Sequence, residues 1–568
     1  LWGQTSPYDA QCPMVTVYQD EACTVKLKDA RQGVVGCAAT ALAQVLYMWK
    51  DEYAKPSVKE GKIQKEIPAR QEVVWEDQHV RINGTTQTGW LKFSDEAIPA
   101  NTVIDWASLL PYYDDTPGTT QERAAAALLS HVCGAAMGIK YGVSFGSGTA
   151  ASDAGGAMAA PYLGFDHVAF RVQQLYPYQQ WLQMLYDELK VAKAVYFTGQ
   201  SSGSGHAFVV DGYDKEDLFH INWGWYGKGN EADADGGYYR LNSLLPTEQG
   251  TGRSLSDDGY RLGQTFATGI YPNAPEPVGS DVMTAFLFYS LEETVEMTDH
   301  SCVLPVKYAV RNLTTPLLAN CQIGLCIEKD GDKHYIELSE FSDHGIYDGI
   351  TAVEEPADLT LTGLEDGTYI LSFCYRQEDT ETAWIPCAGA ATHQVRLTVE
   401  GNIVTITNME DFTLMVMDSD VTPTGYPEGE PISITYRMKV SEGSLHDILL
   451  VAAIPLKEGV EDPDKPTCSS DIEEMYYGEA DTEFDLSCRF TGLTEGTYRI
   501  KAKSENFHAG ADLGTIQVVK GADGIHTVRV LPSNAVRYYD MQGRPVTENH
   551  RGLLIRQEGD TFKKIINQ

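Results

Sequence analysis

Residues 33–44 read Gly-Val-Val-Gly-Cys-Ala-Ala-Thr-Ala-Leu-Ala-Gln. The alanine- and leucine-rich part continues without glycine or proline, which predicts a helix over residues 38–49. Cys37 would then stand at the helix N-terminus, where free N–H groups and the helix dipole favour a thiolate. A cysteine on an alanine-rich helix is also a common small core residue, so a nucleophilic role requires a base elsewhere in the chain.

The candidate base is a histidine far downstream. His206 follows a Ser/Gly-rich loop at 201–205 and precedes an apolar stretch. β-branched and aromatic residues predict short strands at 195–197, 207–210 and 218–221. Most histidines are surface or satisfied core residues, but this position offers little packing reason for one. We therefore interpret His206 as a candidate general base.

Two further segments complete the candidate site. The strand at 218–221 leads into Asn222 and Trp223, and pairing with the preceding strand could place either residue beside the imidazole. Gln4 lies near the beginning of the sequence, and its neutral amide could donate to a developing oxyanion. Spacing alone does not separate that role from a surface glutamine.

The sequence changes character near residue 272. Before it, helical patterns such as 178–190 mix with short strands, which is typical of an α+β fold. Residues 272–277 are proline-rich and predict a linker. Beyond them, short alternating runs separated by turns predict immunoglobulin-like β-sandwiches. The stretch Thr-Gly-Leu-Glu-Asp-Gly-Thr-Tyr at 362–369 recurs as Thr-Gly-Leu-Thr-Glu-Gly-Thr-Tyr at 491–498, which indicates two copies of one module.

These patterns divide the chain into four segments. We predict an α+β domain at 1–275, a first β-sandwich at 276–400, a second at 401–530, and a short β-rich tail at 531–568.

Composition excludes several function classes. The 568 residues include 43 basic and 80 acidic side chains, a net charge of −37, and most of the acidic excess lies between 276 and 530. No run of basic residues suits a nucleic-acid partner. No apolar run approaches the roughly 20 residues that span a bilayer, so no membrane insertion is expected. Hydrophobic residues make up 43%, too much for a disordered acidic chain.

The cysteines do not suggest a metal site or a disulfide scaffold. There are 11 of them, an odd number, and no two are separated by only two residues. The nearest pair, Cys321 and Cys326, lacks a second pair for zinc. Asp-Ala-Asp-Gly at 233–236 begins like a calcium loop, but the later ligands are missing and a solvated loop is the better interpretation. We expect no metal and no other cofactor.

Five motifs in order resemble the streptopain family of secreted bacterial cysteine peptidases, which have a papain-like fold. They are Trp-x-Gln-x-x-Pro-Tyr at 2–8, Gly-Cys-x-Ala-Thr-Ala-x-Ala-Gln at 36–44, Gly-His-Ala-Phe-Val-x-Asp-Gly at 205–212, His-x-Asn-Trp-Gly-Trp-x-Gly at 220–227 and Gly-Tyr-Tyr-Arg-Leu at 237–241. The resemblance covers roughly residues 1–270.

The resemblance implies catalytic roles for four residues. Cys37 would be the nucleophile, His206 the general base and acid, and Gln4 the oxyanion-hole donor together with the N–H of Cys37. Asn222 would orient the histidine, with stacking by Trp223 as the competing arrangement.

The resemblance also implies a substrate cleft. Ser147 and the backbone of Gly205 would contact the substrate peptide, and Trp223 and Trp225 would line the cleft beside the histidine. The chain would be a monomeric endopeptidase acting on protein substrates, inhibited by its own propeptide, and located outside the bacterium in secreted or cell-surface form.

Some segments depart from the family pattern. Residues 59–76 form a charged insertion and 228–237 a long loop, and both are expected to flank the cleft, so they put specificity in doubt more than catalysis. Residues 536–555 resemble the endings of many secreted Bacteroidetes proteins, although a final hairpin of the preceding sandwich would read the same way.

Two other functions fit the same residues. In the first, the sandwiches of an adhesin or binding protein carry the function and the peptidase-like domain is inert. In the second, the Cys–His chemistry serves an acyltransferase or a transglutaminase-like enzyme.

Overall fold

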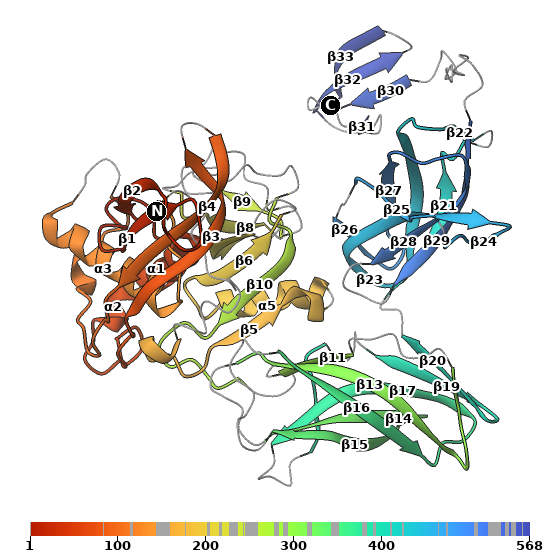
Figure 1. Cartoon of the computed structure of the whole chain (residues 1–568), viewed down its shortest axis with the longest axis horizontal. Coiled ribbons are helices and arrows are strands. Elements are labelled where there is room, and N and C mark those ends of the chain that lie inside the picture. The colour runs from red at the N-terminus through yellow and green to blue at the C-terminus, as the bar shows by residue number, and fades with distance from the viewer. Residues whose placement is uncertain are drawn as a thin grey trace.

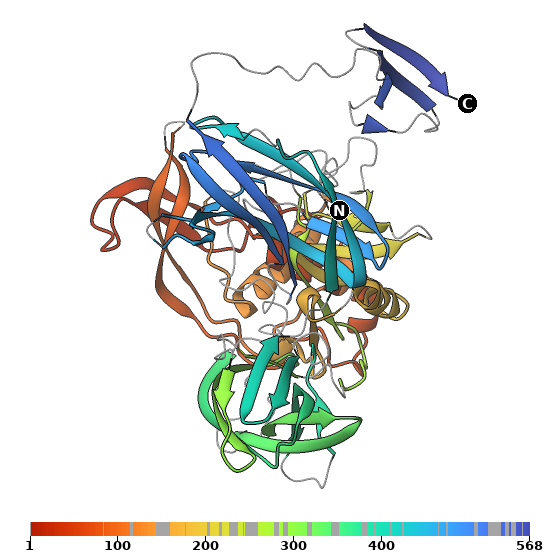
Figure 2. The same cartoon turned by 90° about the vertical axis from the view of Figure 1, so that its right-hand side faces the viewer.

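The chain forms an N-terminal α+β unit, two β units and a small C-terminal sheet (Figures 1 and 2). The structure, a computed structural model, describes residues 2–82, 85–113, 118–143, 160–176, 178–201, 205–214, 218–225, 237–241, 244, 259–277, 283–287, 294–314, 321–341, 352–377, 383–389, 394–408, 412–422, 425–463, 465–472, 475–504, 509–520, 536–539, 545–546, 552–558 and 561–567.

The N-terminal unit contains helices and two sheets. Its described helices are α1 (Cys37–Met48), α2 (Lys50–Tyr53), α3 (Thr120–Ala136) and α5 (Tyr178–Leu189), with short 3-10 turns η1 (Trp106–Ser108) and η2 (Gln173–Leu175). One sheet has the order β2 (Lys26–Gln32), β1 (Met14–Tyr18), β4 (Thr85–Asp95), β3 (Arg70–Ile82). The other has the order β5 (Ala169–Val172), β10 (Leu262–Thr268), β6 (Val195–Gln200), β7 (Gly205–Tyr213), β8 (Phe219–Asn222), β9 (Tyr238–Tyr239).

The six-stranded sheet separates two hydrophobic cores. Alternate residues of a strand face opposite sides. Ala207 and Val209 of β7 therefore join the core around α1 and α3, whereas Phe208 and Val210 join the core around α5. The predicted helices at 38–49 and 178–190 and the three predicted strands are confirmed within one or two residues at most ends, because their local patterns agree with the tertiary burial.

The predicted insertion at 59–76 runs into β3. This strand pairs along β4, and β4 pairs β1, so the charged segment ends in a sheet of the N-terminal unit rather than in an isolated loop. Arg70, at the start of β3, forms an ion pair with the buried Asp95 and donates to the carbonyl of Ile139 at 2.9 Å. A buried carboxylate needs such a partner.

The first β unit consists of two sheets around one core. One sheet has the order β11 (Met283–Leu287), β13 (Ser301–Asn312), β16 (Ala352–Thr362). The other has the order β12 (Thr294–Glu296), β20 (Ile403–Asn408), β19 (Val395–Glu400), β17 (Gly367–Gln377), β14 (Cys321–Lys329), β15 (Asp332–Phe341), with β18 (Ile385–Pro386) paired to β17. Buried apolar residues of both sheets form one cluster.

One predicted boundary falls inside a hairpin. β19 and β20 pair over their whole length, from Val395 with Asn408 to Glu400 with Ile403. The chain therefore stays in the first β unit beyond the predicted boundary at 400. Gly401, with φ 61°, makes the tight turn. Glycine and asparagine mark hairpin turns as well as linkers, so local composition does not separate the two.

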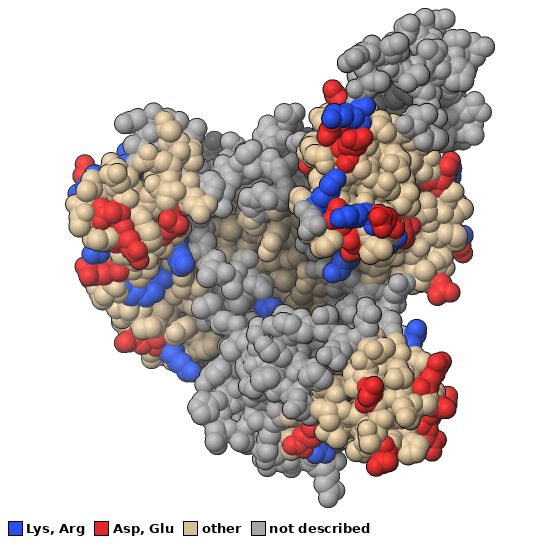
Figure 3. Space-filling model, turned by 45° about the vertical axis from the view of Figure 1, so that its right-hand side comes forward, with Lys and Arg blue, Asp and Glu red and all other residues tan. Residues whose placement is uncertain are grey.

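The second β unit is built around the long strand β23 (Ile432–Lys457). The path of the sheet is β21 (Phe412–Ser419), β23, β28 (Gly496–Ser504), β29 (Gly510–Val519), β22 (Tyr426–Pro427), and β23 also pairs β24 (Val460–Glu461), β25 (Cys468–Ser469), β26 (Met475–Glu479) and β27 (Glu483–Phe490). It has its own apolar cluster. In the view of Figure 3, acidic and basic side chains intermix on this unit, whereas acidic ones predominate on the described surface of the first β unit.

The repeated eight-residue motif adopts the same corner in both β units. Tyr369 at the start of β17 donates its hydroxyl to the carbonyl of Glu365 at 3.1 Å, and Tyr498 at the start of β28 donates to that of Thr494 at 2.9 Å. In each copy the hydroxyl reaches back four residues along the chain. The sequence repeat is therefore a structural repeat as well.

The chain ends in a four-stranded sheet. Its order is β31 (Pro545–Val546), β30 (Val536–Tyr539), β32 (Gly552–Glu558), β33 (Thr561–Asn567). Over the described part of the chain, no helix combines the length and apolar character needed to cross a membrane.

Candidate active site

Cys37 is the first residue of α1. Gly36 precedes it with φ 87° and ψ 151°, a positive-φ conformation that is strained for residues with a side chain. The carbonyl of Gly36 accepts the N–H of Thr40 at 3.1 Å. The cysteine is half-buried, while the residues that follow it in the first turns are buried. A glycine before the cysteine therefore lets the chain turn sharply and start the helix with the sulfur at its N-terminal end.

The N-terminal segment lies against the same helix start. The carbonyl of Gln4 accepts the N–H of Val35 at 3.0 Å, two residues before Cys37. The N–H of Trp2 donates to Oε1 of Gln44 at 3.4 Å. Gln4 itself is buried, with 4% of its surface exposed. The structure thus brings Gln4 next to the segment that leads into α1, although more than thirty residues separate it from the helix.

His206 lies near the start of β7 and is surrounded by rings. Its imidazole is 5% exposed and stacks on Trp225 with ring centroids 4.7 Å apart. The ring of Tyr260 is 5.2 Å away and that of Trp223 is 6.1 Å away. Burial among these rings lowers the pKa of His206 to about 4, and the hydrogen bond to the Trp223 backbone opposes this change. The imidazole is therefore neutral near pH 7.

One ring nitrogen of His206 is already engaged. Nε2 lies 2.9 Å from the carbonyl oxygen of Trp223. A carbonyl only accepts hydrogen bonds, so the neutral ring carries its proton on Nε2 and leaves the lone pair on Nδ1. Nδ1 is consequently the nitrogen that can take up a proton from a nucleophile.

The described hydrogen bond of the Asn222 side chain is made to the following turn and not to the imidazole. Its Oδ1 accepts the N–H of Gly224 at 3.2 Å, two residues ahead. This bond shapes the turn whose Trp223 carbonyl accepts from His206. Asn222 thus supports the histidine through the backbone of the turn.

The same turn touches the face of α1 that carries Cys37. Gly224 has φ 71°, and a Cβ placed there would lie 3.1 Å from Cγ2 of Thr40 and 3.7 Å from Nε2 of Gln44. Thr40 and Gln44 follow Cys37 by three and seven residues, so all three share one helix face. The absence of a side chain at Gly224 lets the histidine-bearing layer approach that face.

Two contributors to the site were not singled out in the sequence. Gly199 on β6 is paired with His206, and a Cβ there would collide with the carbonyl oxygen of Tyr260. The missing side chain lets Tyr260 lie over the sheet beside the imidazole. Gly199 lies two residues beyond the predicted strand at 195–197, and a glycine next to a strand was the available signal, since such glycines often mark a close backbone approach.

The other predicted site residues are only partly described. Gly205 is exposed at the first position of β7, paired with Gln200. Trp223 and Trp225 are 1% and 2% exposed and line the aromatic surroundings of the histidine. Ser147 and most of the loop at 228–237 lie outside the described residues.

The cysteines differ in environment. None of the eleven takes part in a disulfide bond. Burial raises the pKa of Cys133, which lies in the core of the N-terminal unit, and of Cys387 in the first β unit. Cys37 shares its half-buried position with Cys23 and Cys468. Within the described ranges, no group of three or more His, Cys, Asp or Glu side chains could hold a metal ion.

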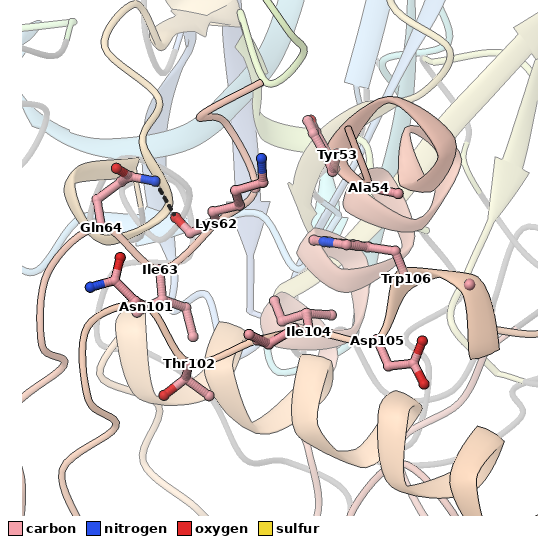
Figure 4. A pocket seen from close by; sticks show the side chains of 13 residues that line it. Tyr53, Ala54, Lys62, Ile63, Gln64, Asn101, Thr102, Ile104, Asp105 and Trp106 are labelled. Carbon is pink, nitrogen blue, oxygen red and sulfur yellow. Dashed lines mark hydrogen bonds between the residues drawn. The ribbon is translucent and has the colours of Figure 1, made fainter. Parts of the chain in front are cut away.

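A separate pocket lies away from this site. It has a volume of about 580 Å³ and adjoins α2, beyond the C-terminal end of α1 (Figure 4). The rings of Tyr53 and Trp106, 5.3 Å apart, form one wall, and residues 61–64 and 101–104 form the other sides. It is therefore no part of the Cys37 site.

Comparison with known proteins identifies similar sequences for the N-terminal unit. Residues 2–232 match the model of the Peptidase C10 family. The chain is 26% identical over 321 residues to the thiol protease/hemagglutinin PrtT of Porphyromonas gingivalis. This alignment covers 56% of this chain and 30% of PrtT, and it is longer than the segment 1–275. It is 30% identical over 169 residues to streptopain of Streptococcus pyogenes, covering 30% of this chain and 40% of streptopain. The chain thus spans less than half the length of these relatives.

Among solved structures, the chain is similar to active interpain A of Prevotella intermedia. The sequence identity is 28%, with 48% of this chain and 92% of interpain A covered and a TM-score of 0.33. A prointerpain A fragment from the same organism aligns with 25% identity, 49% and 70% coverage and a TM-score of 0.30.

Proposed function

We propose that this chain is a secreted cysteine endopeptidase that hydrolyses peptide bonds in protein substrates, because residues 2–232 match the model of the Peptidase C10 family and the chain is similar to streptopain. The N-terminal unit would have the papain-like fold of that family. The observation that carries the proposal is the hydrogen bond from Nε2 of His206 to the Trp223 carbonyl, which leaves Nδ1 as the free base.

The first half-reaction forms a thioester. Nδ1 of His206 takes the proton of the Cys37 thiol as the sulfur attacks the substrate carbonyl. The side-chain amide of Gln4 and the N–H of Cys37 donate to the resulting oxyanion. The imidazolium then gives its proton to the nitrogen of the breaking C–N bond, and the amine product leaves. Burial lowers the pKa of His206 and favours the neutral ring that acts as the base.

The second half-reaction restores the enzyme. His206 takes a proton from a water molecule that attacks the thioester carbonyl, and the same oxyanion donors act again. Collapse of the intermediate expels the Cys37 sulfur, which regains its proton from the imidazolium, and the carboxylate product leaves. Asn222 shapes the turn that orients the histidine, and Trp223 and Trp225 exclude water from its ring. Ser147 and Gly205 would bind the substrate backbone.

Further parts of the proposal concern the whole protein. The two tyrosine corners support immunoglobulin-like sandwiches for both β units. A propeptide of the chain would inhibit the site until activation, and the mature enzyme would act as a monomer outside the bacterium or on its surface. The C-terminal sheet would serve export or attachment.

Labelling with an epoxysuccinyl thiol inhibitor tests the nucleophile. We expect modification of Cys37 alone, found by peptide mapping, and loss of casein cleavage in Cys37→Ala. Cys23→Ala is the matched control, since Cys23 is the other half-buried thiol of the same unit. Cleavage by Cys37→Ala at the wild-type rate would contradict the proposal.

Two alternative functions are compatible with the same candidate residues. The relative PrtT is named a hemagglutinin as well as a thiol protease, so the β units could bind cell surfaces while the N-terminal unit is inert. Cell binding that persists in Cys37→Ala, together with no cleavage by the wild type, would favour that function. Addition of an amine acceptor would reveal acyl transfer as a new amide product.

A further inference from the structure

The first β unit supplies two residues to the core that surrounds the candidate base. Leu313 and Ala388 are 0% and 2% exposed. Both belong to the cluster that contains Phe208, Trp223 and Trp225 of the N-terminal unit. A hydrophobic core is normally completed within its own domain. Here, part of the core is closed by residues beyond the linker.

The two units also share backbone pairing. The N–H of Phe170 in β5 donates to the carbonyl of Leu313 at 2.7 Å, and Ala169 forms an antiparallel bridge with Thr314. The other side of β5 pairs β10. Leu313 and Thr314 therefore cover the edge of the six-stranded sheet, where unpaired backbone groups would otherwise meet solvent.

Local hydrogen bonds hold the contributing segments in one conformation. Oδ1 of Asn312 accepts from the backbone N–H and the hydroxyl of Thr314 at 3.0 and 2.9 Å. The N–H of Ala388 donates to the carbonyl of Met283 at 2.7 Å, and the hydroxyl of Thr284 donates to the carbonyl of Ala388 at 2.8 Å. All three polar side chains are buried (Asn312, Thr314 and Thr284), so water does not compete for these hydrogen bonds.

A row of rings crosses the sheet from β10, the neighbour of β5, towards the histidine. Phe266 of β10 lies opposite Phe197 of β6, which lies opposite Phe208 of β7, with ring centroids 6.1 and 5.3 Å apart. Phe266 is also paired with Arg171 of β5. His206 precedes Phe208 by two residues and so shares its face of the sheet.

We propose that Leu313 is a positioning residue for His206, and that the first β unit is a fixed part of the peptidase rather than a separable module. This inference rests on the proposed function. Packed interiors transmit displacements because they contain few voids. Removal of the Leu313 side chain leaves a cavity in the cluster that contains these rings, and the rings can then shift the imidazole. Small displacements of a catalytic base lower kcat strongly, by up to about a hundredfold per ångström.

The test uses point variants of the full chain, because truncation would expose the edge of β5 and the core together. Leu313→Ala is compared with Leu304→Ala. Leu304 is the same residue type and equally buried, but it belongs to the core of the first β unit. We expect Leu313→Ala to lower kcat roughly tenfold or more with KM changed less than about twofold. The rate of Cys37 alkylation should fall and its pH profile should shift. Leu304→Ala should keep the wild-type kcat, KM and pH profile.

Hydrogen exchange provides a readout that does not depend on activity. Amides of β5 and β7 should exchange faster in Leu313→Ala and at the wild-type rate in Leu304→Ala. If Leu313→Ala does not fold, Leu313→Val should show the same changes to a smaller extent. Unchanged kcat and unchanged protection in a folded Leu313 variant would overturn the inference. A wild type without peptidase activity would overturn the proposed function instead, and exchange alone would then decide whether Leu313 supports the sheet.

Discussion

His206 is held by the backbone carbonyl of Trp223, with Nε2 and the oxygen 2.9 Å apart. Many cysteine and serine hydrolases orient their histidine with a side-chain amide or carboxylate. In this chain a main-chain carbonyl holds the imidazole of His206, and the turn that presents this carbonyl also touches α1 through Gly224. The partner of the histidine therefore cannot be removed by changing a side chain.

This relationship predicts a partial effect for Asn222→Ala. The substitution removes the acceptor for the N–H of Gly224 but leaves the Trp223 carbonyl in the chain. We expect kcat to fall by roughly tenfold, short of the loss of about a thousandfold or more in Cys37→Ala. Steady-state kinetics on one peptide substrate would measure both. An Asn222→Ala variant as inactive as Cys37→Ala would show that the side chain itself acts on the imidazole.

The close approach at Gly224 predicts a large effect of a single methyl group. Gly224→Ala combines a left-handed backbone conformation with contact to Thr40, so we expect reduced peptidase activity and a destabilisation of about 1–3 kcal/mol. Gly363→Ala is the matched control, with the same φ of 71° and nothing within 4 Å of the added carbon. It should cost about 1 kcal/mol and leave activity unchanged. Equal activity of the two variants would contradict the packing argument.

The buried histidine predicts a loss of stability in mild acid. Burial lowers the pKa of His206 from 6.5 to about 4, so between these values the unfolded state binds more protons than the folded state. The free energy of unfolding should therefore fall as the pH drops from 6.5 to 4, by at most roughly 3 kcal/mol from this group. Urea unfolding of wild type and His206→Gln at pH 7.5 and 4.5 measures it. The variant should lose less stability across that interval, and an equal loss would contradict the assignment.

The carboxyl of Glu188 predicts the opposite dependence of folding stability on pH. Desolvation raises the pKa of Glu188 from 4.5 to about 7, against the opposing effects of the Gly269 N–H and the Arg171 charge. Between pH 4.5 and 7 the folded state binds more protons, so this group makes stability fall as the pH rises through that interval. Glu188→Gln should raise the free energy of unfolding at pH 8 by about 1–3 kcal/mol and have little effect at pH 4. A lower stability of the variant at pH 8 would contradict this sign.

Much of the N-terminal unit could be predicted from local patterns. The helix after Gly36 and the strand after His206 form because alanine-rich and β-branched stretches prefer those conformations wherever they pack. The repeat at 362–369 and 491–498 likewise predicted two copies of one module, and both copies form the same corner because its glycines and tyrosine act within a few residues. The end of the first β unit could not be located, because the turn at Gly401 has the composition of a linker.

The sequence by itself determined the local supports of the candidate nucleophile and base: Cys37 at a helix start, and His206 at a strand start. Only the tertiary structure decided how the histidine is held, because the Trp223 carbonyl and the Tyr260 ring reach it through strand register and a glycine on β6. It also decided that Leu313, more than a hundred residues beyond His206, closes the same core. Backbone carbonyls and apolar packing carry no residue signature, so contacts of this kind become visible only when distant segments meet.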